Sequence, residues 1–341
     1  MDAAVSPVGI AVLGLGGFGS FATESIRGCA ATTLIGGFDP NPDRGRDYAA
    51  RFACRGFRSL DEVLQTPEVE AVFLASPNGI HREQAAQAAG CGRHVFCTKP
   101  IANTVADGLA MVRACRDAGV VLMMDNPPPV WGGTMAALKR AVLAGEIGEL
   151  CMAEAHLSSG NGLRLDPGQW RWYRDQCPGG SLHQLGVYQA NALHYLIGPA
   201  KRVFAFFGRL HTKAEIPDVT ATVIEFESGV LGYLGSSYVA DASPAFLQIH
   251  GTKGTVTLGQ DGPVIKGPDG ATRTLDPASG GQDHSHGDLL ASFVRLIREG
   301  KCREVDVMPA VRSLAIVDAA TRSVELGRPV VLREEYPALY D

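Results

Sequence analysis

Several features that would assign a protein to a class at once are missing from this sequence. Its 31 Lys and Arg residues do not outnumber its 36 Asp and Glu residues, so no basic excess points to nucleic acid. None of the eight cysteines forms a CxxC pair, and no Cys/His cluster has zinc spacing. The N-terminal apolar stretch, 8–15, is interrupted by glycines at the length of a strand, and no basic segment precedes it. We therefore expect a cytoplasmic chain with reduced cysteines, no metal, no membrane anchor and no nucleic-acid partner.

What is present is the composition of an ordinary globular protein. The 341 residues are 45% hydrophobic and 20% charged, and the chain is too long for one typical core, so two domains are expected. In residues 1–126, near-continuous apolar strands alternate with helices, which is typical of a doubly wound parallel sheet covered on both faces. In residues 127–341 the strands are longer and more alternating, which predicts an α+β domain with a large, mostly antiparallel open sheet.

These patterns give a set of predicted elements. The first domain is expected to hold strands at 8–13, 33–38, 71–75, 94–97 and 120–124, and helices at 18–28, 43–52, 81–89 and 104–118. The second is expected to hold strands at 150–157, 200–210, 219–227, 230–238, 246–250 and 255–258, and helices at 134–143, 181–196, 287–299 and 309–326. Glu227-Ser228-Gly229 predicts a hairpin turn between two of these strands.

A glycine-rich turn, Gly14-Leu15-Gly16-Gly17-Phe18-Gly19, directly follows the first predicted strand and opens a helix. In such a turn Gly14 permits the tight bend, Gly16 lets the backbone approach a pyrophosphate, and Gly19 lets helix and strand pack closely. The helix N-terminus then offers N–H groups to the phosphates. The context predicts a Rossmann domain that binds a nicotinamide dinucleotide, with a turn that holds no ligand as the alternative.

Asp39 lies twenty residues after Gly19, at the end of the second predicted strand. We expect its carboxylate to accept hydrogen bonds from the adenosine ribose hydroxyls and to repel a 2′-phosphate, which favours NAD over NADP. Arg44 lies close enough in sequence to complicate that choice. Asp39 can also serve as a helix N-cap for the segment that begins at Pro40.

Four further segments, in order along the chain, resemble motifs of the glucose-fructose oxidoreductase / inositol dehydrogenase / MocA-like oxidoreductases. They are Ala75-Ser76-Pro77-Asn78-Gly79-Ile80-His81, Cys97-Thr98-Lys99-Pro100, residues 179–188 (GGSLHQLGVY) and residues 249–255 (IHGTKGT). The resemblance implies an N-terminal Rossmann domain, a C-terminal α/β domain and an active site in the cleft between them. It also implies a homodimer or homotetramer formed through the open face of the C-terminal sheet.

The resemblance carries roles to individual residues. Ser76, Pro77, Asn78 and His81 match a loop that flanks the ribose and nicotinamide of the cofactor, although His81 alone would more often be a buried structural histidine. Lys99 matches the catalytic lysine, and a cis Lys99–Pro100 bond would aim it at the substrate. The expected cofactor-binding residues are Gly14, Gly16, Gly17, Phe18, Gly19, Asp39, Arg44, Ser76, Pro77, Asn78, His81 and Lys99.

Three positions depart from the family pattern: Thr98, Gln184 and Tyr188 stand where the family has Glu, Asp and His. Glutamine does not titrate, so Gln184 is expected to orient a substrate hydroxyl. Lysine and tyrosine both titrate, so Lys99 and Tyr188 form a workable base and acid. His183 is the rival for the missing histidine, with a buried structural role as its alternative.

The remaining polar residues suggest where a substrate binds. The segment 169–174 (QWRWYR) joins aromatic rings to arginines, which suits a sugar ring or a carboxylate, or else packs its tryptophans over the sheet. The expected substrate-binding residues are Lys99, Asn126, Asn161, Arg164, Trp172, Gln184, Tyr188 and Asn191. His284 and His286 lack a third metal ligand nearby.

The predicted function is an NAD(P)-dependent oxidoreductase that moves a hydride between a nicotinamide and a secondary alcohol of a sugar, polyol or glycoside. One alternative is a redox-assisted glycoside lyase or hydrolase with tightly bound NAD. The other is an NAD-binding sugar sensor without catalysis.

Overall fold

The computed structural model describes residues 6–125, 132–240, 246–259, 262–277, 285–300 and 307–340. The chain forms two compact units. The first unit comprises Met1–Ala102, Ala106–Pro127 and His284–Met308, and the second comprises Asn103–Val105, Pro128–Asp283 and Pro309–Asp341. Two segments cross the boundary predicted at 126/127: residues 103–105 group with the second unit, and residues 284–308 group with the first.

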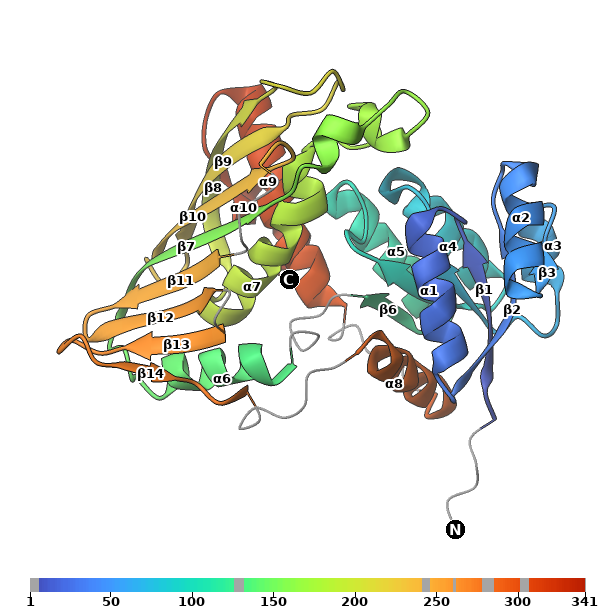
Figure 1. The fold of residues 1–341 in the computed structure, drawn as a ribbon, viewed down its shortest axis with the longest axis horizontal. Coiled ribbons are helices and arrows are strands. Elements are labelled where there is room, and N and C mark those ends of the chain that lie inside the picture. Colours follow the sequence, from blue (N-terminus) through green and yellow to red (C-terminus); the bar gives the residue numbers. More distant parts are fainter. Residues whose placement is uncertain are drawn as a thin grey trace, which may run out of the picture. The chain divides into compact units, whose positions relative to one another are not determined.

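The first unit is built on a six-stranded sheet in the order β3-β2-β1-β4-β5-β6, and every neighbouring pair is parallel. Its strands are β1 (Val8–Leu13), β2 (Thr32–Phe38), β3 (Arg55–Gly56), β4 (Ala71–Leu74), β5 (His94–Thr98) and β6 (Leu122–Asp125). Its helices are α1 (Gly17–Gly28), α2 (Pro42–Phe52), α3 (Leu60–Gln65), α4 (His81–Gly90), α5 (Val105–Asp117) and α8 (His286–Arg298). The predicted doubly wound parallel sheet is confirmed (Figure 1).

The strand order reverses beside β1, which lies between β2 and β4. Ligands of doubly wound sheets bind at such a switch point, outside the carboxyl ends of the strands. The glycine-rich turn leaves β1 at this place. Two short elements, β3 and α3, were not predicted, because two and six residues are too few to show a periodicity.

The second unit is built on a nine-stranded sheet in the order β14-β13-β12-β11-β7-β10-β9-β8-β15, in which only the β7–β10 pair is parallel. Its strands are β7 (Leu150–Ser158), β8 (Ala200–Gly208), β9 (Val219–Phe226), β10 (Leu231–Ser237), β11 (Phe246–Gly251), β12 (Gly254–Gly259), β13 (Gly262–Lys266), β14 (Thr272–Thr274) and β15 (Val330–Val331). Its helices include α6 (Gly132–Leu143), α7 (Val187–Ile197), α9 (Met308–Leu326) and α10 (Leu332–Glu335). The mostly antiparallel sheet and the 227–229 hairpin are confirmed, whereas β13, β14 and β15 were missed.

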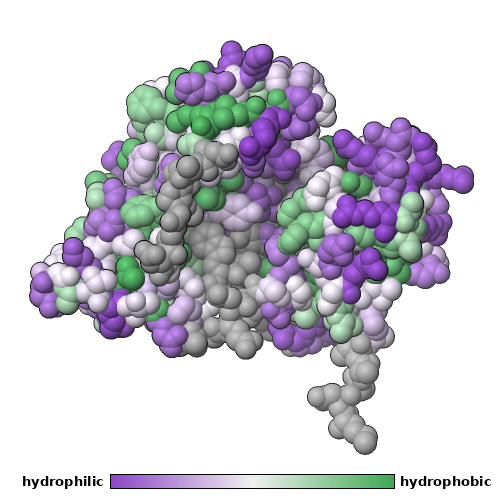
Figure 2. All heavy atoms as spheres, in the orientation of Figure 1, coloured by the Kyte–Doolittle hydropathy of each residue, from purple (hydrophilic) through white to green (hydrophobic). Residues whose placement is uncertain are grey.

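One face of this sheet carries the helices, and the other carries exposed apolar side chains. On the helical side, the Ser236 hydroxyl of β10 donates to the Ser181 hydroxyl before α7 at 3.0 Å. The other side, called here the open face, presents side chains that are 42–71% exposed: Met152, Phe206, Val223, Leu231 and Tyr233. They are neighbours, since Val223 pairs with Tyr233 and Leu231 with Met152. In Figure 2 hydrophilic side chains cover much of the visible surface, with hydrophobic stretches between them.

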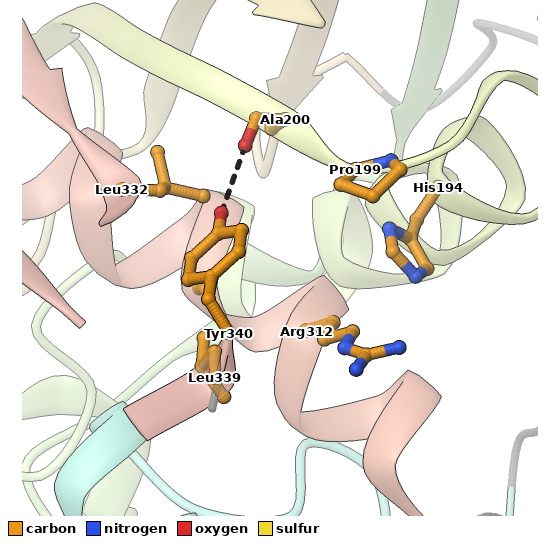
Figure 3. Close-up of a pocket in the computed structure, with 8 residues that line it drawn as sticks. His194, Pro199, Ala200, Arg312, Leu332, Leu339 and Tyr340 are labelled. Carbon is orange, nitrogen blue, oxygen red and sulfur yellow. Dashed lines mark hydrogen bonds between the residues drawn. The ribbon is translucent and has the colours of Figure 1, made fainter. Parts of the chain in front are cut away.

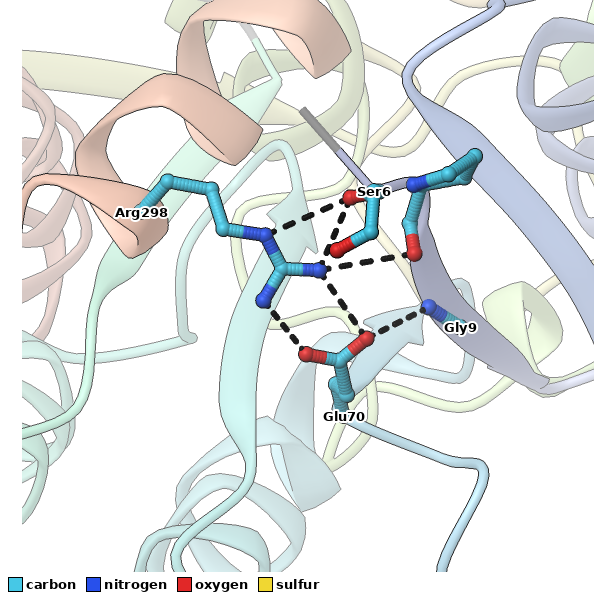
Figure 4. A network of polar contacts seen from close by, with 5 residues as sticks. Ser6, Gly9, Glu70 and Arg298 are labelled. Atoms are coloured by element: carbon cyan, nitrogen blue, oxygen red, sulfur yellow. Dashed lines mark hydrogen bonds and ion pairs between the residues drawn. The ribbon is translucent and has the colours of Figure 1, made fainter. Parts of the chain in front are cut away.

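Helix α8 belongs to the first unit because apolar and polar contacts both hold it there. Its buried face includes Phe293, whose ring lies 5.2 Å from that of Phe96 on β5. At its end the Arg298 guanidinium donates to Glu70 at 2.7 Å and to the Ser6 carbonyl at 2.9 Å (Figure 4). The Glu70 carboxylate also accepts from the Gly9 N–H at 3.3 Å, so this network joins α8 to the start of β1.

Replacing Glu70 with Gln tests this network. The guanidinium of Arg298 lowers the pKa of Glu70, so the ion pair stabilises the folded chain above the unfolded pKa near ~4.3 and the gain is lost as pH falls below it. We expect Glu70→Gln to lower the free energy of unfolding by about 1 kcal/mol at pH 7, measured by urea denaturation. The difference should shrink toward zero on acidification, and the exposed Glu68→Gln variant should match the parent throughout.

Candidate functional site

Two positions of the glycine-rich turn admit no side chain. Gly14 has a φ of +92°, and a Cβ there would lie 2.6 Å from the backbone nitrogen of Ser76. A Cβ on Gly19 would lie 2.1 Å from the carbonyl oxygen of Gly14. The first turn of α1 and the end of β4 therefore approach this bend at backbone contact, as the motif predicts for Gly14 and Gly19.

Gly16 and Gly17 are glycines for a different reason. Both are exposed at the N-terminus of α1, and a Cβ at either position would meet nothing within 4 Å. Gly16 has φ −73° and ψ −165°, which any residue adopts, and no side chain caps the helix. Phe18 anchors the turn by packing against Phe73, with ring centroids 6.4 Å apart. The result is a bare backbone with free helix N–H groups, a surface that fits the pyrophosphate of a dinucleotide.

Asp39 is fixed beside this turn at the end of β2. Its side chain is buried, one carboxylate oxygen accepts from the Leu15 N–H at 3.0 Å, and the other accepts from the Asn41 N–H at 3.0 Å. The exposed Arg44 guanidinium lies 3.8 Å from the carboxylate. Asp39 is not the N-cap of α2, because Asn41 occupies that position and accepts from Asp43. Its two bonds instead hold the carboxylate against the glycine turn.

The loop after β4 is ordered by buried polar contacts. The Ser76 hydroxyl donates to Gln84 at 2.6 Å, and Pro77 leads into a short 3₁₀ helix at Asn78. Asn78 is 3% exposed, and its amide nitrogen has no hydrogen-bond partner among the described residues. A buried donor without a partner is costly, so this amide fits a site that a bound ligand completes.

His81 supports this loop from inside. The imidazole is fully buried, with Nε2 3.0 Å from the Ser76 carbonyl and Nδ1 3.1 Å from the Ile101 carbonyl. Burial lowers the pKa of His81, so the ring is neutral at pH 7. This placement fits the buried structural histidine that is the alternative interpretation of His81, since the ring connects two loops.

Lys99 follows β5 directly and is half-buried, and the Lys99–Pro100 peptide bond is cis. Thr98 pairs with Asp125 in the register of β5 and β6. The buried Asp125 carboxylate lies 2.6 Å from Nδ1 of His286 at the start of α8, and this contact raises the pKa of His286. The sequence does not reveal this pairing, because it joins residues far apart in the chain.

In the second unit, Gln184 and Tyr188 straddle a change in helix type. Residues Leu182–Gly186 form a π-helical turn that runs into α7, where one continuous α-helix was predicted. Gln184 is 3% exposed; its Oε1 accepts from Nε of Arg171 at 3.1 Å and its amide donates to Cys177 Sγ at 3.6 Å. Tyr188 is half-buried and lies near Tyr238, whose pKa is raised chiefly by burial and to a smaller extent by Tyr188.

The rival histidine is an interior residue. His183 is fully buried, its Nε2 lies 3.0 Å from the carbonyl of Asn103, and burial lowers its pKa to about 4. Gly179 packs so closely that a Cβ there would lie 2.1 Å from Nδ1. A neutral ring enclosed in this way does not fit the acid–base role predicted for His183.

The other predicted substrate residues are placed as follows. Asn191 is buried and accepts from the Ser313 hydroxyl of α9 at 2.9 Å, which is a helix-packing contact. Asn161 and Arg164 are exposed and bond to each other at 3.0 Å. Trp172 packs against a buried cluster that contains Tyr238. Asn126 and His284 lie outside the described residues.

A cavity of about 310 Å³ lies elsewhere in the second unit (Figure 3). His194 and Arg312 border it with Tyr340, whose hydroxyl donates to the Ala200 carbonyl at 3.2 Å. Burial, together with the Arg312 charge, lowers the pKa of His194 to about 4. None of the predicted site residues lines this cavity, so it is separate from the candidate site.

The described ranges hold neither a metal-binding cluster nor a membrane-spanning helix. No group of three His, Cys, Asp or Glu side chains there is arranged to hold a metal ion. No helix in the same ranges is both long and apolar enough to cross a membrane.

Comparison with known proteins gives a consistent result in both halves of the chain. Residues 8–126 match the GFO/IDH/MocA oxidoreductase family with its NAD-binding Rossmann fold, and residues 135–257 match the GFO/IDH/MocA C-terminal domain. The chain is 28% identical over 251 residues to 1,5-anhydro-D-fructose reductase of Ensifer adhaerens, covering 71% of this chain and 74% of that protein.

Two further similarities are informative. The chain is 28% identical to 2,7-anhydro-N-acetylneuraminate hydratase of Escherichia coli, over 64% of this chain and 59% of that protein. A crystal structure of an NADPH-dependent oxidoreductase from Desulfitobacterium hafniense superimposes with a TM-score of 0.85 at 27% identity, covering 97% of this chain and 99% of that one.

Three observations point to a dinucleotide site in the first unit: the family match, the glycine-rich turn at the switch point of the sheet, and the buried amide of Asn78, which is unpaired among the described residues. The chain therefore belongs to the GFO/IDH/MocA family and is an oxidoreductase whose N-terminal Rossmann fold binds NAD.

Proposed function

We propose that the chain oxidises or reduces a secondary alcohol of a sugar, polyol or glycoside with NAD. The observation that carries the proposal is the position of Lys99. This lysine stands where the family has its catalytic lysine, directly after β5, in the same unit as the glycine-rich turn. A reductase and a hydratase of anhydro sugars are among the similar proteins, which supports a carbohydrate substrate.

Oxidation of an alcohol removes a hydride from carbon and a proton from oxygen. NAD, when bound, accepts the hydride on its nicotinamide ring. Lys99 takes the hydroxyl proton in this proposal, and Tyr188 shares that task because its phenol both donates and accepts. Gln184 positions the substrate, since an amide does not titrate and Arg171 holds it in place.

A second candidate is a reaction that oxidises the substrate only transiently and keeps NAD bound. The similarity to a hydratase favours it, and so does the replacement of the family's aspartate by Gln184. The two candidates differ in stoichiometry, because only the dehydrogenase releases one NADH for each substrate consumed.

Tyr188→Phe and Lys99→Met test the chemistry. The parent chain is assayed with NAD and a panel of sugars, inositols and glycosides, and NADH fluorescence measures the reaction. We expect it to reduce NAD with at least one of these compounds. Loss of an acid–base group removes about 10²–10⁴-fold of rate, so each variant should lower kcat by at least about 10²-fold. NADH binding should stay near the parent value in Tyr188→Phe, since Tyr188 is not among the expected cofactor-binding residues. Parent-like turnover of Tyr188→Phe across pH would remove Tyr188 from the mechanism. Turnover of a glycoside without NADH release would favour the second candidate.

We also propose that NAD is preferred over NADP, because the Asp39 carboxylate is fixed where a ribose hydroxyl would bind and repels a phosphate there. Asp39→Asn keeps the shape and removes the charge. It should weaken NADH binding about tenfold, in line with a lost charged hydrogen bond, and strengthen NADPH binding, both measured by calorimetry.

Arg44 supplies the control for this experiment. Once Asp39 is neutral, the guanidinium 3.8 Å away can pair with a 2′-phosphate. Adding Arg44→Ala to the Asp39→Asn variant should therefore cancel the gain for NADPH. Equal NADH and NADPH affinities in the parent chain would refute the preference.

Finally, we propose that copies of the chain associate through the open face, because soluble monomers rarely leave such contiguous apolar patches in water. Val223→Glu with Tyr233→Glu would place charges in that interface at high cost. Light scattering after size exclusion should show a dimer or tetramer for the parent and a monomer for the double variant. Leu163→Glu, at an exposed leucine of another surface, should leave the parent mass unchanged. A parent chain that is monomeric at micromolar concentration would contradict the proposal.

A further inference from the structure

Arg171 has an unusual set of neighbours for a half-buried cation. Its Nε–H donates to the amide oxygen of Gln184 at 3.1 Å, and its charge lies near the buried Tyr238, where it opposes the rise in pKa that burial causes. Both neighbours are neutral. No carboxylate of the described residues lies within ion-pair distance of Arg171.

Within the described part of the chain, Arg171 lacks a negatively charged partner because Gln184 stands where the family has aspartate. Where the family has aspartate, an arginine at this distance would be paired with a negative charge. Gln184 accepts the same hydrogen bond through its amide oxygen but contributes no charge. The site around Gln184 therefore keeps a full positive charge that no carboxylate of the described residues neutralises.

The guanidinium is also held in one orientation. It lies over the ring of Trp170, with 4.2 Å between its central carbon and the ring centroid. Trp170 and Trp172 in turn pack against the buried cluster that contains Cys177 and Tyr238. Stacking, packing and the bond to Gln184 together fix the plane of the guanidinium before any ligand arrives.

Donors remain available after these contacts. A guanidinium carries five N–H groups, and the bond to Gln184 uses one of them. The terminal nitrogens therefore keep N–H groups free of described protein partners, in the fork that matches a carboxylate. A half-buried charge without a counter-ion is unfavourable, and an anionic ligand relieves that cost.

We propose that the substrate is a sugar acid, a uronic or aldonic acid, and that Arg171 binds its carboxylate while Gln184 lies next to it. The inference rests on the proposed function and narrows its substrate class. An arginine that only orients Gln184 would satisfy the contacts above equally well, but it would confer no preference for an acid over the matching neutral sugar.

Matched pairs of neutral and acidic sugars test the proposal: D-glucose with D-glucuronate, D-galactose with D-galacturonate, and sorbitol with D-gluconate. The intact chain is assayed with NAD by NADH fluorescence, and the thermal shift caused by each compound is measured with NADH present. We expect kcat/KM for the acid of at least one pair to exceed that for its neutral partner by about 10-fold or more. The same acid should give the larger thermal shift.

Variants at two arginines assign the preference. Arg171→Met should remove the preference for the acid, largely through KM, while turnover of neutral sugars changes less. Arg171→Lys keeps the charge without the fork and should retain part of the preference. Arg174→Met, an exposed arginine of the same segment, is the matched control and should behave as the parent does. Circular dichroism of each variant confirms that it folds.

The outcomes separate the inference from the function on which it rests. Turnover of neutral sugars at least equal to that of the acids overturns the inference and leaves the proposed function standing. An acid preference that survives in Arg171→Met overturns the assignment to Arg171. If no compound of the panel yields NADH and none of the acids shifts the melting temperature, the inference fails together with the oxidoreductase proposal for these substrates.

Discussion

The first unit depends on a backbone contact that leaves no room for a single methyl group. The bend after β1 presses its Gly14 against the backbone of Ser76, and the first turn of α1 presses Gly19 against the carbonyl of Gly14. Three segments meet there because glycine removes the only atoms that would keep them apart. The buried Asp39 then reaches the Leu15 N–H from the neighbouring strand and ties the end of β2 to the same bend. The site for the dinucleotide is thus a by-product of how tightly these segments pack.

Buried and half-buried polar side chains hold the candidate site residues of each unit in place. His81 bridges the carbonyls of Ser76 and Ile101, so the loop after β4 and the loop that follows Lys99 share one buried support. Asp125 and His286 join β6 to α8 in the same unit. In the second unit, Arg171 fixes Gln184, and His183 anchors the start of its helix to the carbonyl of Asn103. His81, Asp125, Gln184 and His183 are thus each held by a partner from another segment of the chain.

How much the sequence predicts follows from the range of the interactions involved. The parallel sheet, the glycine turn and Asp39 are local patterns of strand, turn and helix, and they were predicted with nearly correct bounds. The strand β3 and the π-helical turn at Leu182–Gly186 are too short, or too dependent on packing, to leave a periodic signal. The pairings of Asp125 with His286 and of Asn191 with Ser313 join residues that are more than a hundred positions apart. Nothing in the neighbourhood of these residues encodes their partners, so the sequence leaves Asn191 open between a substrate contact and helix packing, and the structure gives it a helix-packing bond to Ser313.

The glycine-rich turn contains glycines that are needed for two different reasons. The fold itself requires Gly14 and Gly19. At Gly16 and Gly17 a side chain would meet no protein atom within 4 Å, and Gly16 has backbone angles that any residue adopts. A descendant of this chain that gave up its dinucleotide would keep the first pair, or fail to fold, and would be free to drift at the second. Relatives that use the cofactor are therefore expected to keep Gly16 and Gly17. A relative that keeps Gly14 and Gly19 but has lost the two middle glycines is expected to have lost dinucleotide binding, as a pseudoenzyme would.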